Sequence, residues 1–179
     1  FTYTYTDPLG CSNSTKDTIT LINGPSISFQ TIDSICITGG LVTLAATPTG
    51  GTFSGNGVLG TTFDPQLVGI GLHTIYYTVS NYLGCVNMDS MQIRVLPLPA
   101  INFNGNTTQL CVDASTINLL ASPAGGTFSG AGVLGNTFTP NTSLIGNNTI
   151  YYSVTDINGC NNIDSFIITV NPLPNVSWN

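Results

Sequence analysis

A block of eleven residues occurs twice in this chain at a spacing of 75 residues, and this repeat constrains the fold more than any other feature. Residues 50–60 read GGTFSGNGVLG, and residues 125–135 read GGTFSGAGVLG. The likeness continues in TIYYTV at 74–79 and TIYYSV at 149–154. A fixed period of this size indicates tandem modules of one fold. It also bears on function, because a residue present in one copy only is a poor candidate for an activity that the copies share.

The period also divides the chain into segments. The stretches LPLP at 96–99 and NPLP at 171–174 separate the copies. Proline removes backbone donors and favours an extended path, so we expect short, stiff linkers and modules that follow one another in an extended rod. We expect a window on a longer array. Its segments are the C-terminal hairpin of a truncated preceding module (1–24), two complete modules (25–96 and 97–171), and a linker with the first strand of a further module (172–179).

The apolar residues follow a period of two. They alternate with polar residues at 74–79 and 91–95, and the same pattern returns at 149–154 and 166–170. Such alternation predicts strands with one buried face. Helix signals are weak, because the chain has no Glu and is rich in Gly and Pro. Several short strands separated by turns predict an all-β sandwich in each module.

Charge is scarce, and this excludes several classes of partner. Only 6% of the residues are charged, the bases are Lys16 and Arg94 alone, and the formal net charge is −6. Nucleic acids and anionic membranes both attract basic surfaces, so neither is an expected partner. No apolar run is long enough for a bilayer span, and we expect no direct membrane insertion. A neutral surface rich in Thr, Asn, Ser and Gly is typical of extracellular stalks, adhesins and fibres.

The glycine-rich segments favour turns over phosphate binding. Residues 55–57 (GNG) and 130–132 (GAG) lack the Lys-Ser/Thr that follows a phosphate-binding loop. We expect tight turns or bulges there that need a positive φ. Residues 82–84 and 157–159 end in Gly just before a Cys, and they predict hairpin turns.

The five cysteines allow two disulfide registers. The first joins Cys36 to Cys85 and Cys111 to Cys160, with a partner for Cys11 outside the chain. The second joins Cys11 to Cys36 and Cys85 to Cys111 across the linkers. A ten-residue strand after Cys85 spans roughly 33 Å, which favours the first register, since the second needs one module to fold onto the next. One His and no CxxC pair make zinc a poor alternative, and disulfides indicate an oxidising compartment.

Side chains for catalysis or ligand binding are few. His73 is the sole histidine, and Asn148 replaces it in the second copy, so we expect a strand-edge surface residue rather than a catalyst. Asp89 and Asp164 are equivalent in the repeat, and we expect turn capping at the start of the last strand, with calcium ligation as the alternative.

Four aromatic residues are candidates for stacking on sugars. They are Tyr76, Tyr151, Tyr82 and Trp178. The second copy has Ile157 where the first has Tyr82, which weakens a shared platform. Trp178 takes the place of Phe29 and Phe103, so we expect it to pack in a core.

An ordered set of motifs spans nearly the whole chain. In the second copy it comprises Cys111 before a strand, LASPAGGTFSG at 120–130, NTFTP at 136–140, IYY at 150–152 and DINGC at 156–160, with VNPLP at 170–174 after them. This set resembles the PKD-like and Ig-like tandem repeats of giant Bacteroidota cell-surface adhesins. The resemblance implies Ig-like or PKD-like β-sandwich modules, type IX secretion, an extracellular location at the cell surface and, in some relatives, a link to gliding motility.

The resemblance also implies O-glycosylation at Asp-Ser/Thr followed by an apolar residue. The candidates are Thr18, Ser34, Ser90 and, more loosely, Ser165. Each of them follows an Asp.

Taken together, these features predict a non-enzymatic structural repeat that needs no cofactor and no metal. We expect a disulfide-stapled stalk or fibre within a long adhesin or filament. One alternative is a spacer or carbohydrate-binding module of a secreted polysaccharide-degrading enzyme, and the other is a fibre subunit that assembles laterally. The expected partners are adjacent modules of the same longer chain, surface glycans or other copies in a fibre.

Overall fold

The computed structural model describes residues 1–177, and its regular structure is almost entirely β. We call residues 25–96 the first unit and residues 97–171 the second unit, after the sequence repeat. The N-terminal hairpin consists of β1 (Thr2–Thr6) and β2 (Ser12–Lys16). The first unit contains β3 (Ser28–Phe29), β4 (Ser34–Cys36), β5 (Val42–Thr43), β6 (Ala46–Thr47), β7 (Thr52–Ser54), β8 (Val58–Leu59), β9 (Thr62–Phe63), α1 (Pro65–Val68), β10 (Gly71–Ser80) and β11 (Val86–Leu96). The second unit contains β12 (Gln109–Cys111), β13 (Ile117–Asn118), β14 (Thr127–Ser129), β15 (Val133–Leu134), β16 (Thr137–Phe138), the 3₁₀ helix η1 (Thr142–Leu144), β17 (Gly146–Thr155) and β18 (Asn161–Asn171).

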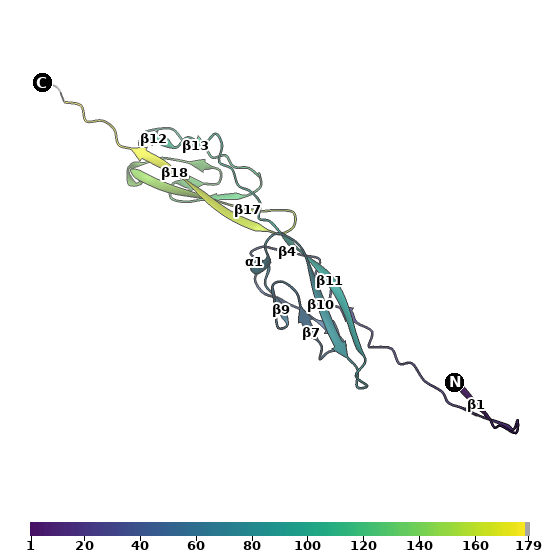
Figure 1. Ribbon diagram of the computed structural model, residues 1–179. Helices are drawn as coiled ribbons and strands as arrows, with labels where there is room; N and C mark the ends of the chain where they lie inside the picture. Colours follow the sequence, from purple (N-terminus) through teal and green to yellow (C-terminus); the bar gives the residue numbers. More distant parts are fainter. Residues whose placement is uncertain (178–179) are drawn as a thin grey trace.

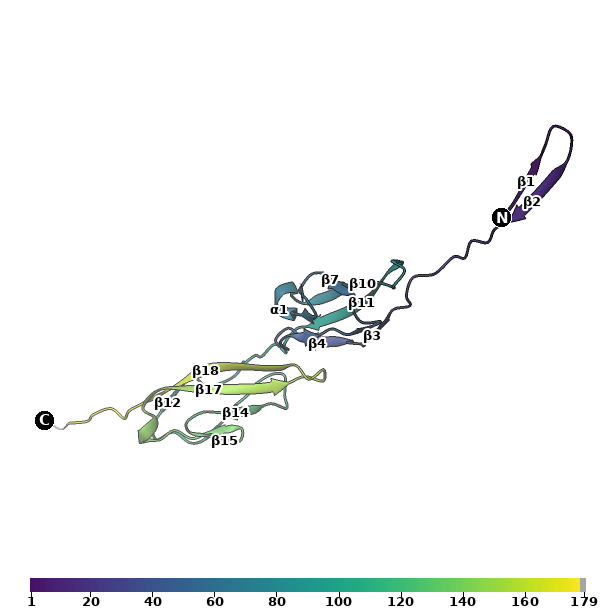
Figure 2. The same ribbon diagram turned by 90° about the horizontal axis from the view of Figure 1, so that it is seen from below.

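Each unit is built on one four-stranded sheet. The strand order is β4-β11-β10-β7 in the first unit and β12-β18-β17-β14 in the second. The long hairpins β10–β11 and β17–β18 are antiparallel, whereas β4 and β12 join them in parallel. Smaller sheets, β5-β9-β8 with β3-β6 and β13-β16-β15, complete the two units. The two long hairpins lie in separate parts of the molecule, and β1 lies far from β18 in both views (Figures 1 and 2).

The cores confirm the prediction of an all-β sandwich. Ile75, Tyr77 and Val79 are buried at 0%, 2% and 5% exposure, and the residues between them are half-buried or exposed. Side chains of the smaller sheets cover this face. The core clusters comprise Leu44, Phe63, Ile75, Ile93 and Val95 with Ala46, Tyr77 and Val79 in the first unit, and Leu119, Phe138, Leu144, Ile150, Ile168 and Val170 in the second, where Tyr152, Val154 and Cys160 are buried as well.

Two short helical turns were not predicted from the sequence. α1 begins after Asp64, whose side chain accepts the N–H of Gln66, and Pro65 stands at its first position. η1 begins after Asn141, whose side chain accepts the N–H of Ser143. Asp and Asn are preferred caps because their oxygens satisfy free N–H groups of the first turn. Helical turns of four and three residues are too short to stand out in an all-β sequence pattern.

The N-terminal hairpin shows what the repeat looks like without a covering sheet. Phe1, Tyr3 and Tyr5 align with the buried residues of β10, yet they are 79%, 67% and 58% exposed. Residues 172–177 carry no strand, and residues 178–179 lie outside the described part of the chain. The predicted segment boundaries stay a prediction.

Candidate functional site

His73 and Asn148, which differ between the copies, perform the same structural task. His73 lies half-buried in β10, and its Nε2 lies 3.0 Å from the carbonyl oxygen of Gly69. The Nδ2 of Asn148 donates to the carbonyl of Leu144 at 2.7 Å and to that of Gly146 at 3.1 Å. Both side chains hold the backbone of the helical turn that precedes the long strand. The ring of His73 lies 6.2 Å, centroid to centroid, from the buried ring of Phe63, so His73 is only partly at the surface, where a surface residue was expected.

The repeat-equivalent carboxylates lie within strands rather than at strand starts. Asp89 Oδ1 accepts the N–H of Ser90 at 2.8 Å, and Asp164 Oδ1 accepts that of Ser165 at 2.7 Å. Both carboxylates are exposed on β11 and β18 and bind their own neighbour, so the expected turn capping is wrong. Within residues 1–177, no three His, Cys, Asp or Glu groups lie close enough to hold a metal ion.

The four O-glycosylation candidates are all exposed, as an acceptor hydroxyl must be. Thr18 follows β2 and Ser34 begins β4. Ser90 lies opposite Tyr76 on the neighbouring strand, and Ser165 lies opposite Tyr151 in the same register. Glycosylation itself stays a prediction.

The aromatic candidates do not form one platform. Tyr76 and Tyr151 are 41% and 48% exposed on equivalent strands, one in each unit. Tyr82 is 94% exposed at a hairpin turn where the second unit has an equally exposed Ile157. Trp178 lies outside the described residues.

The surface hollows repeat only in part. A hollow of about 220 Å³ beside Tyr77 has a counterpart of about 180 Å³ beside Tyr152. An open groove of about 410 Å³ runs along β3 and β6 in the first unit. The residues that line these three hollows carry no carboxylate, imidazole or amine.

A buried tyrosine ties the glycine-rich segment to the sheet in both units. The hydroxyl of Tyr77 donates to the carbonyl of Pro48 at 2.7 Å and accepts the N–H of Gly51 at 2.8 Å. A Cβ on Gly51 would collide with the carbonyl oxygen of Thr78 and with the ring of Tyr77, so the close approach requires glycine here. The second unit repeats both hydrogen bonds at the same distances through Tyr152, Pro123 and Gly126.

The glycine turns confirm the sequence prediction. Gly55 and Gly57 have φ of 138° and 76°, and the equivalent Gly130 and Gly132 have 143° and 76°. Their positive φ values favour residues without a Cβ. These segments are backbone turns of the fold.

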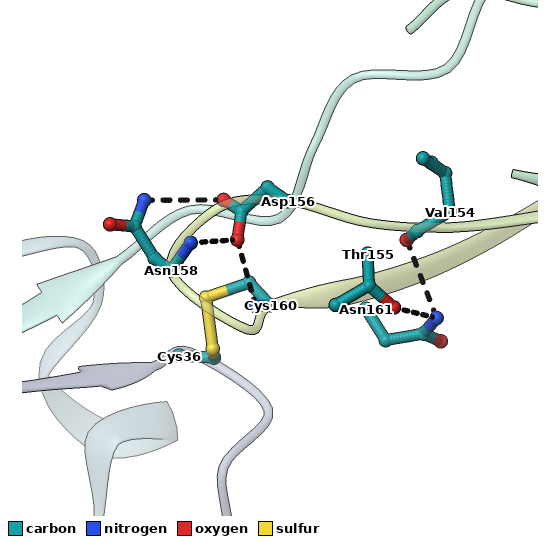
Figure 3. Close-up of a disulfide and its surroundings, with 7 residues drawn as sticks. All are labelled: Cys36, Val154, Thr155, Asp156, Asn158, Cys160 and Asn161. Carbon is teal, nitrogen blue, oxygen red and sulfur yellow. Dashed lines mark hydrogen bonds between the residues drawn. A yellow bond between two sulfur atoms is a disulfide. The ribbon is translucent and has the colours of Figure 1, made fainter. Parts of the chain in front are cut away.

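The disulfide joins the two units (Figure 3). Cys36, at the end of β4, bonds to Cys160, which follows the β17–β18 turn; their Cα atoms are 5.5 Å apart and their sequence separation is 124. Cys11, Cys85 and Cys111 are free. The predicted bonds Cys36–Cys85 and Cys111–Cys160 are therefore wrong. The second register, Cys11–Cys36 with Cys85–Cys111, is wrong as well.

Strand length explains why a bond within one unit fails. Cys36 lies opposite Leu96, the last residue of β11, whereas Cys85 precedes Val86, the first residue of that strand. Ten residues of strand span about 33 Å, and bridged Cα atoms lie only about 6 Å apart. The second unit has the same arrangement. In the sequence analysis, the length of this strand was an argument against a disulfide between modules. In the structure, the same length keeps the two cysteines of one unit too far apart for a disulfide.

The linker explains why Cys160 of the second unit lies close to Cys36 of the first unit. Leu96, opposite Cys36, is three residues before Pro99. The carbonyl of Pro99 accepts a hydrogen bond of 2.9 Å from Asn162 Nδ2, and Asn162 is two residues after Cys160. The β17–β18 turn is thereby held beside the linker, within reach of Cys36. Sequence reasoning missed this contact, although the repeat carries a signal for it, since Asn87, the equivalent of Asn162, donates to the carbonyl of Pro25 at 2.9 Å.

Comparisons with known proteins do not assign this chain to a family. No family model matches the chain, and no curated protein does. One solved structure, an endo-fucoidan hydrolase from glycoside hydrolase family 107, is 12% identical with a TM-score of 0.30. That match covers 97% of this chain and 34% of the enzyme, so this chain spans about one third of the enzyme's length. A likeness at this level does not establish a shared fold or activity. Within the described residues, no helix has the length and apolar character that a bilayer crossing requires.

Proposed function

We propose that this chain is a non-enzymatic structural repeat of an extracellular surface adhesin or filament, in which it acts as a disulfide-stapled stalk or fibre. The observation that supports this most is the Cys36–Cys160 bond between one repeat and the next. What the two copies share is a core, a tyrosine held by two backbone groups and a set of turns. The shared parts are those of a load-bearing scaffold.

The bond changes how the chain carries force. When the two chain ends are pulled apart, tension runs from the N-terminus to Cys36, across the disulfide to Cys160, and on to the C-terminus. The intervening sequence, a separation of 124 residues, contains the long strands β10, β11 and β17 and is bypassed, whereas β18 follows Cys160. A stalk that holds a distal tip away from a cell needs this resistance to lengthening.

Compartment and surface chemistry agree with this role. Disulfides persist mainly in oxidising compartments, which supports secretion. The scarcity of charge leaves a surface that salt affects little, as suits exposure outside the cell. The resemblance to adhesin repeats extends the proposal to type IX secretion and to a place at the cell surface.

Force spectroscopy on the chain held at its two ends tests the proposal. We expect the oxidised protein to lengthen far less than the Cys36→Ser variant. At about 3.6 Å per residue, the 124-residue separation adds roughly 450 Å of extended chain once the bond is absent. Cys111→Ser, which removes an exposed free thiol, is the matched control and should behave as the parent. Full extension of the oxidised parent would contradict the stalk role.

A carbohydrate-binding role is the second candidate, supported by the equivalent exposed rings of Tyr76 and Tyr151. Binding of polysaccharides to the full chain, measured by calorimetry, tests it. Binding that is lost in the Tyr76→Ala/Tyr151→Ala variant and kept in Tyr82→Ala would favour this candidate over the stalk. Absence of binding to a broad set of polysaccharides would exclude it.

A further inference from the structure

The five cysteines occupy two kinds of site, and the single disulfide joins one of each kind. We call Cys36 and Cys111 strand cysteines, because each ends the short parallel strand of its unit. We call Cys11, Cys85 and Cys160 hairpin cysteines, because each follows the turn of a long or N-terminal hairpin. Both kinds also include free members.

The strand cysteines have the same backbone environment. Cys36 lies opposite Leu96 in parallel register, and the residue after Cys36 donates its N–H to the carbonyl of Leu96 at 2.9 Å. Cys111 lies opposite Asn171 in the same register, and the residue after it donates to the carbonyl of Asn171 at 2.9 Å. The backbone of Cys111, whose thiol is free, is therefore paired in the same way as the backbone of Cys36.

The hairpin cysteines also share one turn. Four residues before each cysteine, an Asp or Asn side-chain oxygen accepts the cysteine N–H, at 2.9 Å for Cys11, 3.0 Å for Cys85 and 2.8 Å for Cys160. The capping residues are Asp7, Asn81 and Asp156. The glycine before each cysteine has φ of 88°, 82° and 83°, respectively. The three turns therefore share one backbone geometry at the cysteine.

The cysteines also differ in exposure within each kind of site. Cys160 is completely buried and Cys36 is half-buried, whereas Cys111 and Cys11 are exposed and Cys85 is half-buried. The strand site at Cys111 is thus the Cys36 site without a hairpin on it. The turns at Cys11 and Cys85 lack a strand cysteine as a partner, and the Cys85 thiol instead donates to the carbonyl of Ile22 at 3.8 Å.

We propose that Cys111 of one copy of this chain forms a disulfide with a hairpin cysteine, Cys11 or Cys85, of a second copy, in the arrangement of Cys36 and Cys160. The contact is heterologous, because different surfaces meet. Each copy keeps a free site of the other kind. Heterologous contacts that do not close into a ring generate open filaments. The product is a covalent, head-to-tail chain of repeats.

The bond forms by thiol–disulfide exchange with a small-molecule disulfide such as oxidised glutathione. The thiolate of Cys111 attacks a sulfur of that disulfide and releases one thiol. The hairpin thiolate of the second copy then attacks the Cys111 sulfur of the mixed disulfide and releases the second thiol. Two protein thiols are oxidised, one small-molecule disulfide is reduced to two thiols, and the two protons of the protein thiols end on those products.

Three variants of the full chain, each with one free cysteine and an intact Cys36–Cys160 bond, test the proposal. Cys11→Ser/Cys85→Ser keeps Cys111, Cys11→Ser/Cys111→Ser keeps Cys85, and Cys85→Ser/Cys111→Ser keeps Cys11. Each is incubated in a glutathione redox buffer alone and in pairs, and disulfide-linked dimers are measured on non-reducing gels and by mass spectrometry. Oxidation in urea is the control for pairing without a folded site.

We expect the Cys111 variant to form dimers with the Cys85 variant or the Cys11 variant, about tenfold more than any variant forms with itself, which corresponds to about 1.4 kcal/mol of site preference. In urea, this preference should vanish. Equal amounts of like and unlike dimers under native conditions would overturn the proposal, and so would the absence of unlike dimers. The inference rests on the proposed structural role but fails separately, since a chain without cross-linking would still show the short extension expected of the stalk in force spectroscopy.

Discussion

The first and second units carry the same two cysteine sites and use them in opposite ways. The first unit bonds through its strand cysteine, Cys36, and leaves its hairpin cysteine free; the second bonds through Cys160 and leaves Cys111 free. The rest of the two units agrees closely, down to the 2.7 and 2.8 Å hydrogen bonds of the buried tyrosines. The two units therefore differ in which of their cysteine sites faces the other unit, and the disulfide is a feature of the contact between units rather than of either unit alone.

The largest loss of unfolding free energy is expected from removal of the disulfide between the two units. Cys36→Ser opens a loop of 124 residues, and the chain-entropy model gives such a loop up to about 5 kcal/mol of unfolding free energy. Cys111→Ser, the equivalent change in the second unit, should cost less than about 0.5 kcal/mol, as exposed positions usually do. Urea unfolding of both variants measures the contrast. Equal losses would show that the two strand cysteines are bonded alike.

Matched core truncations test whether the units are energetically equivalent. Ile75→Ala and Ile150→Ala remove fully buried side chains at the same position of the two sheets. Each should lower the unfolding free energy by about 2–5 kcal/mol through lost burial and a cavity. Thermal unfolding of each variant should show the two losses within about 1 kcal/mol of one another. A loss of unfolding free energy in only one of the two variants would mean that the two units, although similar in structure, are not equally stabilised by this core position.

The buried tyrosines allow a finer comparison. Tyr77→Phe and Tyr152→Phe each leave a glycine N–H and a proline carbonyl without their hydroxyl partner. An unsatisfied buried group costs about 1–3 kcal/mol, so both variants should lose that much stability. The control is Tyr76→Phe, since Tyr76 is exposed and should change little. If Tyr77→Phe matches this control in urea unfolding, the hydroxyl contributes nothing to the fold.

The smallest effect is expected where the units differ in sequence. His73→Asn places in the first unit the amide that Asn148 uses in the second to bind the helical turn. The unfolding free energy should change by less than about 1 kcal/mol, because a side-chain donor to the turn is retained. His73→Ala, which removes the donor, serves as the comparison. A larger loss in His73→Asn than in His73→Ala would mean that the imidazole has a task which Asn148 does not share.

Much of the fold was predictable because it follows from local chemistry. Alternating residues such as Ile75 and Tyr77 place themselves on one face of a strand, and the repeat shows that the pattern is not accidental. Glycine at positions 57 and 132 indicates a backbone with positive φ, because few other residues tolerate that conformation. The hairpin turns before Cys85 and Cys160 were confirmed for the same reason.

The disulfide was not predictable, because it depends on how one unit is placed on the next. The hydrogen bond from Asn162 to Pro99 holds the β17–β18 turn beside the linker, and asparagine is too common in this chain to draw attention. The tyrosine hydroxyls were missed for a related reason. A sequence shows that Tyr77 alternates inward, but it does not show which backbone groups the ring end will meet.

Two tryptic sites make the bond between units directly measurable. Cleavage after Lys16 and Arg94 gives the peptides 1–16, 17–94 and 95–179. The free thiols are first alkylated, and the protein is then unfolded and digested without reductant. We expect 17–94 and 95–179 to remain joined through unmodified Cys36 and Cys160, to separate on reduction, and to carry the alkyl label at Cys85 and Cys111. Separation of the two peptides without reductant, with all four of these cysteines unlabelled, would establish bonds within each unit and contradict the bond between them.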